Sequence, residues 1–266
     1  MITYDWIQRI KKDCKDFLEN KIPNKDYDFE IIYNAYPERV QGEVPWEVIS
    51  LVAKELGKVI SRNPEPYIDF LKFIQENKDD IGKKIFNSIM KKVALRYPDK
   101  YYTMLKDVIH NTHEESNLKK LFDNIILPLL KKYPEKYLDK LIEWVRLYNS
   151  DKITKNIFGT LSNYIKKTDK KNATEVFKKC ESFWNSDNQS IRTGNALILK
   201  TIFKVNRKLY QEIYCNYQST YNPNFIDILS SAVCEESEII RQLINKWNKS
   251  GNIRIKKAAT IARKNI

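Results

Sequence analysis

Glycine and proline are scarce in this chain. Its 266 residues include 6 Gly and 9 Pro, which is too few for a turn-rich β fold. Cysteine is also rare, because Cys14, Cys180, Cys215 and Cys234 lie far apart without any C-x-x-C pair. This spacing excludes a zinc knuckle and a disulfide framework, and it favours a reducing compartment such as the cytoplasm.

Long apolar runs and phosphate-binding motifs are missing as well. No run approaches the roughly 20 apolar residues that a membrane span requires, and residues 1–17 are amphipathic rather than typical of a signal peptide. The patterns G-x-x-x-x-G-K-[ST], G-x-G-x-x-G and G-x-S-x-G do not occur, so phosphate-loop and serine-hydrolase chemistry lack support. We therefore expect a soluble, intracellular protein that needs no cofactor and no membrane.

Histidine is represented twice, in the sequence HNTHEE. His110 and His113 are followed by Glu114 and Glu115, a spacing that could bring ligands together on a helical turn. A zinc site would require more His or Cys ligands. The sequence therefore predicts no metal site.

What the chain does contain is an internal repeat. The segment 81–109, IGKKIFNSIMKKVALRYPDKYYTMLKDVI, is followed by a similar segment at 117–145, NLKKLFDNIILPLLKKYPEKYLDKLIEWV. Each has a long apolar-periodic helix, a Tyr-Pro turn and a second helix, and the turn prolines Pro64, Pro98 and Pro134 are 34 and 36 residues apart. Such helix pairs bury their apolar faces only by stacking on neighbouring copies.

The apolar rhythm continues to the C-terminus without a flexible linker. It predicts an all-α fold, a right-handed α-α superhelix of about six helix pairs with a last helix. We expect residues 1–43 to form an acidic N-terminal helical cap, and residues 44–266 to form one continuous repeat array. Pro128 falls inside a predicted helix and should kink it.

Positive charge is concentrated in the C-terminal half. The chain has a net charge of +13. Residues 1–50 carry 7 basic and 10 acidic side chains, whereas residues 151–266 carry 21 basic and 10 acidic ones. A field of this sign attracts phosphates or an acidic protein surface. The bias of a GC-poor genome toward lysine codons is an alternative explanation for the total, but explains the asymmetry less well.

Basic pairs recur where the first helix of a unit ends. They are Lys91-Lys92, Lys131-Lys132, Lys166-Lys167 and Arg263-Lys264. Stacked in register, they would form a positive ridge that reads phosphates. The alternative is that these cations only complement the helix dipole, at about 0.3–1 kcal/mol each.

Two C-terminal segments resemble each other and a known type of repeat. FWNSDNQSIRTGNALILKTIF begins at Phe183 and KWNKSGNIRIKKAATIARK begins at Lys246. Each has Trp-Asn, a polar turn, Ile-Arg and a helix with small residues, including Ala196 or Ala258, and this order resembles a HEAT-type unit. The stretch from Ile191, IRTGNALILKTIFKVNRKLYQEI, also resembles the bacterial DNA alkylation-repair glycosylases. That resemblance implies an all-helical, HEAT-like fold that holds DNA in a basic concave groove.

The catalytic residues of that family are not matched here. The family uses a Trp and an Asp one helical turn apart, with an Arg and a further Trp, and only Arg192 has a counterpart. Residues 147–170 contain no Trp, Trp184 and Asp187 fall in a predicted turn, and Ser230 and Ser231 occupy the later aromatic position. Trp144, Trp184 and Trp247 each fall at the end of the second helix of a predicted pair. A tryptophan at such a position usually packs in the core and does not stack on nucleobases.

Together these features predict a non-catalytic binding protein whose partner is the nucleic-acid backbone, in particular DNA. The cations expected to neutralise phosphates are Arg192, Lys200, Arg254, Lys256, Lys257, Arg263, Lys264, Lys131, Lys132, Lys166 and Lys167. Two alternatives remain open: a protein-interaction scaffold that binds an acidic protein segment, and a glycosylase-like enzyme. Fold alone does not decide among them.

Overall fold

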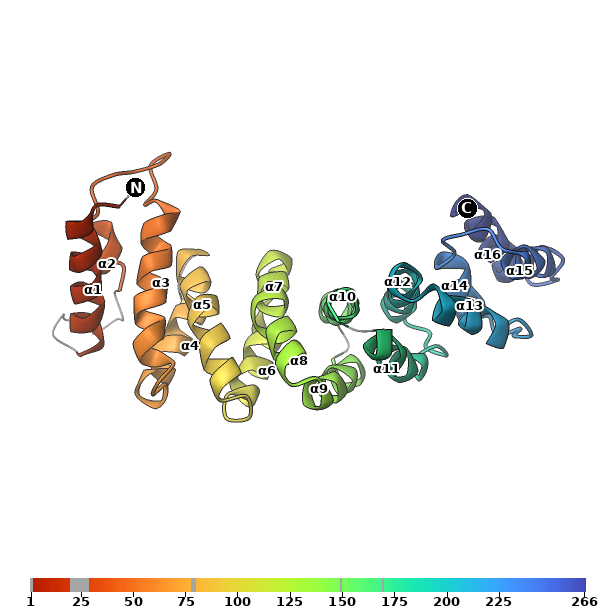
Figure 1. Cartoon of the computed structure of the whole chain (residues 1–266), viewed down its shortest axis with the longest axis horizontal. Coiled ribbons are helices and arrows are strands. Elements are labelled where there is room, and N and C mark those ends of the chain that lie inside the picture. Colours follow the sequence, from red (N-terminus) through yellow and green to blue (C-terminus); the bar gives the residue numbers. More distant parts are fainter. Residues whose placement is uncertain (1, 20–28, 78–79, 149, 169) are drawn as a thin grey trace. The chain divides into compact units, whose positions relative to one another are not determined.

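The computed structural model describes residues 2–19, 29–77, 80–148, 150–168 and 170–266, and the chain is predominantly helical (Figure 1). The described residues contain no β-strand, so the predicted all-α class is confirmed. The chain divides into two compact units, unit 1 (Met1–Lys132) and unit 2 (Tyr133–Ile266). Within the described ranges, no helix has both the length and the apolar character needed to cross a bilayer.

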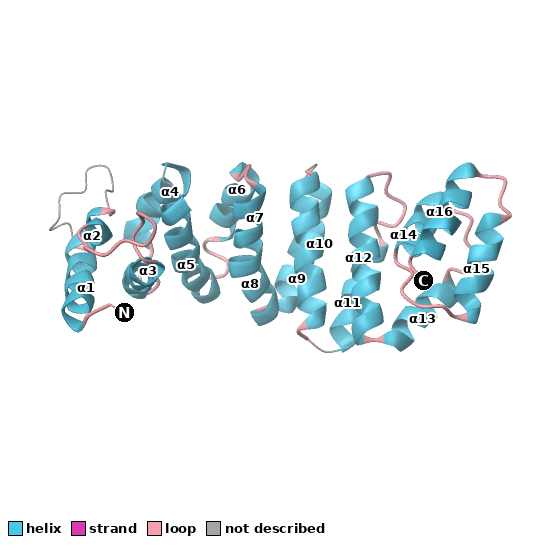
Figure 2. Cartoon of the chain, turned by 90° about the horizontal axis from the view of Figure 1, so that it is seen from above, coloured by secondary structure: helices cyan, strands magenta, loops and turns pink. Residues whose placement is uncertain are grey.

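Unit 1 contains helices from α1 to α8. Their bounds are α1 (Tyr4–Leu18), α2 (Ile31–Asn34), α3 (Trp46–Ile60), a 3-10 turn (Glu65–Tyr67), α4 (Ile68–Asn77), α5 (Asp80–Arg96), α6 (Tyr102–Asn111), α7 (Glu115–Leu121), a π-helix (Phe122–Ile126) and α8 (Leu127–Lys132). Helix α1 packs on α3, α3 packs on α5, and α5 packs on the segment from α7 to α8 (Figure 2). The alternate helices lie outside this row, with α2 against α1 and α3 and α4 against α5.

The N-terminal helices pack directly on the helix that follows them, α3. Residues 1–43 were predicted to form a cap, and α1 buries Ile10, Cys14 and Phe17 on one face. The ring of Phe17 contacts that of Phe70 in α4 edge to face, with centroids 5.4 Å apart. Both helices of that segment, α1 and α2, belong to unit 1.

Pro128 perturbs the helix that contains it. Five residues before α8, Phe122–Ile126, adopt a π-helical turn between α7 and α8. A proline has no N–H to donate to the carbonyl of the residue four positions earlier, and its ring collides with that carbonyl. One wider turn relieves both problems.

Unit 2 repeats the two-row arrangement. Its helices are α9 (Pro134–Leu147), α10 (Asp151–Lys166), α11 (Lys170–Glu181), α12 (Gln189–Val205), α13 (Arg207–Asn216), α14 (Pro223–Ser231), α15 (Glu238–Asn248) and α16 (Ile253–Lys264). Helices α10, α12, α14 and α16 pack in succession as one row, and α9, α11, α13 and α15 pack outside it (Figure 2).

Small residues allow α10 and α12 to approach closely. A Cβ atom at Gly194 would lie 2.2 Å from the ring of Phe158, which is far inside van der Waals contact. In the same interface between α10 and α12, a hydrogen bond of 2.7 Å joins the hydroxyl groups of Ser162 and Thr201. Ala196 is also buried in α12, as the sequence pattern predicted for this helix.

Asparagine caps fix where three helices of this row begin. The side-chain oxygens of Asn188, Asn222 and Asn252 accept backbone N–H groups at the starts of α12, α14 and α16. Caps of this kind are worth about 1 kcal/mol each. They place the first turn of each helix, and hence Arg192 and Arg254, at defined positions.

Candidate nucleic-acid interface

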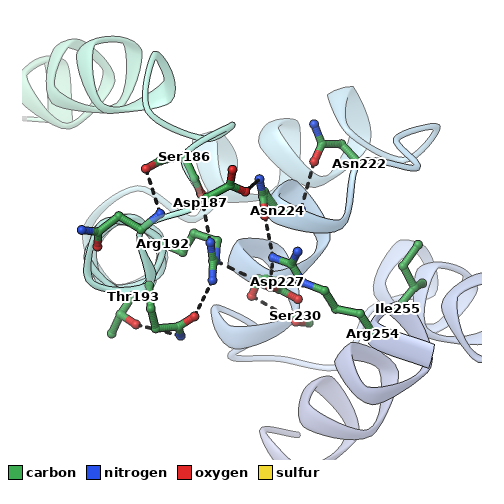
Figure 3. A network of polar contacts seen from close by, with 12 residues as sticks. Ser186, Asp187, Arg192, Thr193, Asn222, Asn224, Asp227, Ser230, Arg254 and Ile255 are labelled. Carbon is green, nitrogen blue, oxygen red and sulfur yellow. Dashed lines mark hydrogen bonds and ion pairs between the residues drawn. The ribbon is translucent and has the colours of Figure 1, made fainter. Parts of the chain in front are cut away.

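Arg192 lies in the first turns of α12 and is largely enclosed. Its Nη1 donates to the carbonyl oxygen of Ser186 at 3.0 Å, and its Nη2 donates to Oε1 of Gln189 at 2.6 Å (Figure 3). Its Nε lies 3.6 Å from Oδ2 of Asp227 in α14, and the side chain is 11% exposed. The guanidinium is therefore used in tying the turn before α12 to α14.

Arg254 at the start of α16 reaches the same carboxylate. Its Nε and Nη2 donate to Oδ2 of Asp227 at 2.9 and 2.6 Å, and its Nη2 also donates to Oδ1 of Asn224 at 2.5 Å (Figure 3). The amide of Asn224 donates in turn to Oδ1 of Asp187 at 3.1 Å. These contacts link the starts of α12, α14 and α16.

A small cavity of about 240 Å³ opens beside this network. Its lining includes Arg192, Arg254 and Lys257, three of the cations singled out in the sequence, together with Asp227. Three positive charges and one negative charge leave the described lining with a net positive charge. Since Asp227 neutralises the two arginines in part, Lys257 is the cation here with no carboxylate partner among the described residues.

The remaining predicted cations of α16 are exposed. Lys256, Lys257, Arg263 and Lys264 all lie on the solvent side of the helix. Within the described part of the chain, no carboxylate lies in ion-pair distance of these four side chains, whereas Arg254 on the same helix is paired. The structure thus gathers five predicted cations on one helix and leaves four of them available to an external anion.

Lys200 belongs to α12 and is half-buried. Lys200 and Lys204 both lie near the thiol of Cys234, which follows the end of α14. Burial raises the pKa of this thiol, and the positive charges of the two lysines oppose that rise. Lys166 and Lys167 are exposed at the end of α10. All three lie on the α10–α12–α14–α16 row, so unit 2 carries nine of the eleven predicted site residues on that row.

Several cations of unit 1 at or near the ends of long helices bond to carbonyl oxygens within the unit. Lys132 donates from Nζ to the carbonyl oxygen of Leu95 at 3.0 Å. Arg96 reaches the carbonyl of Ser61 at 3.4 Å, and Lys92 reaches the carbonyl of Lys54 at 3.4 Å. Leu95 lies in the last turn of α5 and Ser61 lies just beyond α3, where helix carbonyls lack partners within the helix. Lys54 lies farther inside α3.

Lys131 differs from its neighbour Lys132. It is exposed on α8, and it has no ion pair or hydrogen bond with any described residue. Of the Lys131-Lys132 pair, it is therefore the member that an external anion can bind without breaking a hydrogen bond seen among the described residues.

The three tryptophans expected to pack rather than stack on bases are buried in the core. Trp144, Trp184 and Trp247 are each 1% exposed, and Nε1 of Trp184 donates to Oδ1 of Asn195 at 3.1 Å. Their rings are inaccessible to a nucleobase in this fold. Trp184 and Asp187 lie in the turn between α11 and α12, as the sequence predicted.

Among the described side chains, no group of three or more His, Cys, Asp or Glu residues is arranged to hold a metal ion. His113 and Glu114 instead line a mixed-charge cavity of about 620 Å³ in unit 1, together with Lys72 and Asp107.

Asp227 and Asn224 are the residues of this site that sequence reasoning missed. Both lie in α14, between the two helices that carry Arg192 and Arg254. An asparagine cap precedes each of α12, α14 and α16. Asp227 lies five residues after its cap, however, whereas Arg192 and Arg254 lie four and two residues after theirs. No signal in the sequence therefore pairs Asp227 with the two arginines.

No protein-family model, curated protein or solved structure matches this chain.

Proposed function

We propose that the protein binds the phosphate backbone of nucleic acid, in particular DNA, and that it does so without catalysis. The observation that supports this function is the set of exposed cations on α16: Lys256, Lys257, Arg263 and Lys264. Arg254, on the same helix, has a carboxylate partner and these four have none among the described residues. A group of unneutralised cations that the fold does not use is available for phosphate contacts.

Charge supports unit 2 rather than unit 1 as the binding unit. Residues 133–266 contain 24 basic and 13 acidic side chains, whereas residues 1–132 contain 23 and 21. Lys166, Lys167 and Lys200 extend the set of α16 along the same row of helices. In this proposal Arg192 and Arg254 hold the row together and contribute positive potential rather than the main phosphate contacts.

The finer description of the fold belongs to the same proposal. The alternation of packed and outer helices in each unit supports HEAT-like repeats that follow a right-handed superhelical path. The proposed place of action is the cytoplasm, from the four widely spaced cysteines in the sequence.

A charge reversal tests the binding function. In fluorescence anisotropy with a labelled DNA duplex, Lys256→Glu/Lys257→Glu should weaken binding by about 100-fold, because two attractive contacts become repulsive. The matched control is Lys170→Glu/Lys171→Glu on α11, which changes the net charge equally at two exposed lysines of the outer row.

Two results would contradict the proposal. One is an equal loss of affinity in both variants, since that would reflect total charge and not a site. The other is tighter binding of a glutamate-rich peptide than of DNA at the same ionic strength, which would favour a scaffold for acidic protein segments.

A further inference from the structure

A second basic cavity lies in unit 1, where α3, α5 and α7 pack side by side. Its volume is about 360 Å³, at the small end of the range for ligand pockets. The described residues that line it are Trp46, Ser50, Ala53, Lys84, Asn87, Ser88, Lys91, Lys120 and Asn124. Three of these are lysines and none of them is acidic.

Helical spacing places two of the three lysines on one face of α5, and the third lines the same cavity from α7. Lys84, Asn87 and Lys91 are three and four residues apart on α5 and so share one face. Lys120 joins them from α7, where its Nζ donates to Oδ1 of Asn117 at 3.3 Å. Neither Lys84 nor Lys91 has an ion pair with a carboxylate in the described part of the chain, so like charges converge without a counter-charge.

Asn87 supplies an independent indication of a missing partner. Its side chain lies between the two lysines on α5, and the residue is only 5% exposed. Its Oδ1 atom is enclosed and has no hydrogen-bond donor. A buried amide oxygen without a donor is unfavourable, and a ligand that reorients this amide and bonds to it would remove that penalty.

Trp46 gives the cavity an aromatic wall. It opens α3 and, unlike the three tryptophans in the core, is 54% exposed. The Nζ atom of Lys84 lies 5.1 Å from its ring centroid, so a cation and a flat apolar surface are adjacent. Cationic groups beside an exposed aromatic ring suit a phosphate that is joined to a nucleobase.

We propose that this cavity binds a nucleotide, with Lys84, Lys91 and Lys120 on phosphate oxygens and Trp46 against the base. The ligand is either a free nucleotide or one nucleotide of a single strand, since both present the same groups. The site does not depend on the proposed function, because its lining belongs to unit 1 and the duplex contacts proposed above belong to unit 2.

Binding of three probes to the full chain tests this assignment. ATP and inorganic triphosphate are titrated by calorimetry, and a labelled oligodeoxyadenylate is titrated by anisotropy. Lys84→Gln/Lys91→Gln should weaken ATP or oligonucleotide binding by about tenfold or more. The matched control is Lys11→Gln/Lys119→Gln, which removes two exposed lysines of unit 1 that do not line the cavity, and it should stay within about twofold of the wild type.

Trp46→Leu tests the contribution of the base to binding separately from that of the phosphates. It should weaken ATP binding by about fivefold and leave triphosphate binding unchanged. Binding of ATP would identify a free nucleotide as the ligand, and binding of the oligonucleotide alone would identify a single strand. The proposal is overturned if neither binds, if the Lys84/Lys91 variant matches its control, or if Trp46→Leu has no effect. Circular dichroism and melting of each variant establish that it is folded.

Discussion

Arg192 of α12 and Arg254 of α16 share a single carboxylate oxygen. Oδ2 of Asp227 lies 3.6 Å from Nε of Arg192 and 2.6 Å from Nη2 of Arg254. The more enclosed arginine also bonds to the turn before its own helix. The carboxylate therefore neutralises two charges that would otherwise repel each other across α14.

Removal of that carboxylate should destabilise unit 2. Asp227→Ala leaves Arg192, 11% exposed, without a counter-ion and takes three hydrogen-bond and ion-pair contacts from the network. We expect the free energy of unfolding to fall by about 2 kcal/mol, because charged hydrogen-bond partners contribute in this range. Urea denaturation followed by circular dichroism gives the value.

Asp187→Ala is the matched control for Asp227→Ala. Asp187 is exposed and accepts its hydrogen bond from Asn224 rather than from an arginine. It should cost clearly less, about 0.5 kcal/mol. Equal losses in the two variants would show that the carboxylate shared by the arginines contributes no more to stability than that of Asp187.

Gly194→Ala tests the close approach of α10 and α12. The added methyl group would lie 2.2 Å from the ring of Phe158, and overpacking of this kind costs about 1–3 kcal/mol. Chemical denaturation should detect the loss. The double variant Gly194→Ala/Phe158→Leu should regain part of it, since the smaller side chain vacates the ring position. A Gly194→Ala protein as stable as the wild type would contradict the packing described here.

Two buried tyrosines predict a loss of stability in alkali. Tyr210 and Tyr214 donate their hydroxyls to the carbonyls of Ala232 at 3.0 Å and Leu229 at 2.7 Å. Burial raises the pKa of Tyr210 from 10.0 to about 12 and that of Tyr214 well above 10.0. Above pH 10 the unfolded chain therefore loses protons that the folded chain retains, and ionisation favours unfolding.

The stability present below pH 10 should consequently decline as the pH rises toward 12. Denaturant midpoints at pH 8, 10 and 11 measure the decline. Tyr214→Phe should lower stability at pH 8 through the lost hydrogen bond, and it should also make the fall between pH 10 and pH 11 shallower. An unchanged slope in this variant would mean that the decline has another source.

The pair Lys131 and Lys132 provides a comparison of neighbours. Lys132→Met should reduce stability by about 0.5 kcal/mol, because its Nζ donates to Leu95 O at the end of α5. Lys131→Met should be neutral for stability, since that side chain is exposed and makes no contact of this kind among the described residues. Thermal melts of the two variants under identical conditions measure the difference in stability. Equal effects would contradict a stabilising contact between Lys132 and the end of α5.

Much of the fold was predictable because it depends on local periodicity. Apolar spacing located the helix pairs, Pro128 indicated the perturbed helix, and the positions of Trp144 and Trp247 suggested packing. These features depend on residues within one or two turns of each other. Helical spacing and proline geometry therefore suffice to predict them.

The side-chain partners were not predictable in the same way. Asp227 finds its two arginines only after three helices are stacked in register, and its sequence neighbours do not reveal the pairing. Lys92 and Lys132 presented the same pattern as a phosphate-binding ridge, yet they bond to carbonyls 38 and 37 residues away. The cavity of Lys84, Lys91 and Lys120 likewise depends on how α5 faces α7.

The most direct test of the central claim is the salt dependence of duplex binding. If about six cations of unit 2 contact phosphates, the plot of log affinity against log salt concentration should have a slope near −5. In Lys256→Gln/Lys257→Gln the slope should change to about −3, because each lost contact removes about 0.9. A wild-type slope near zero, or the same slope in the variant, would contradict the account.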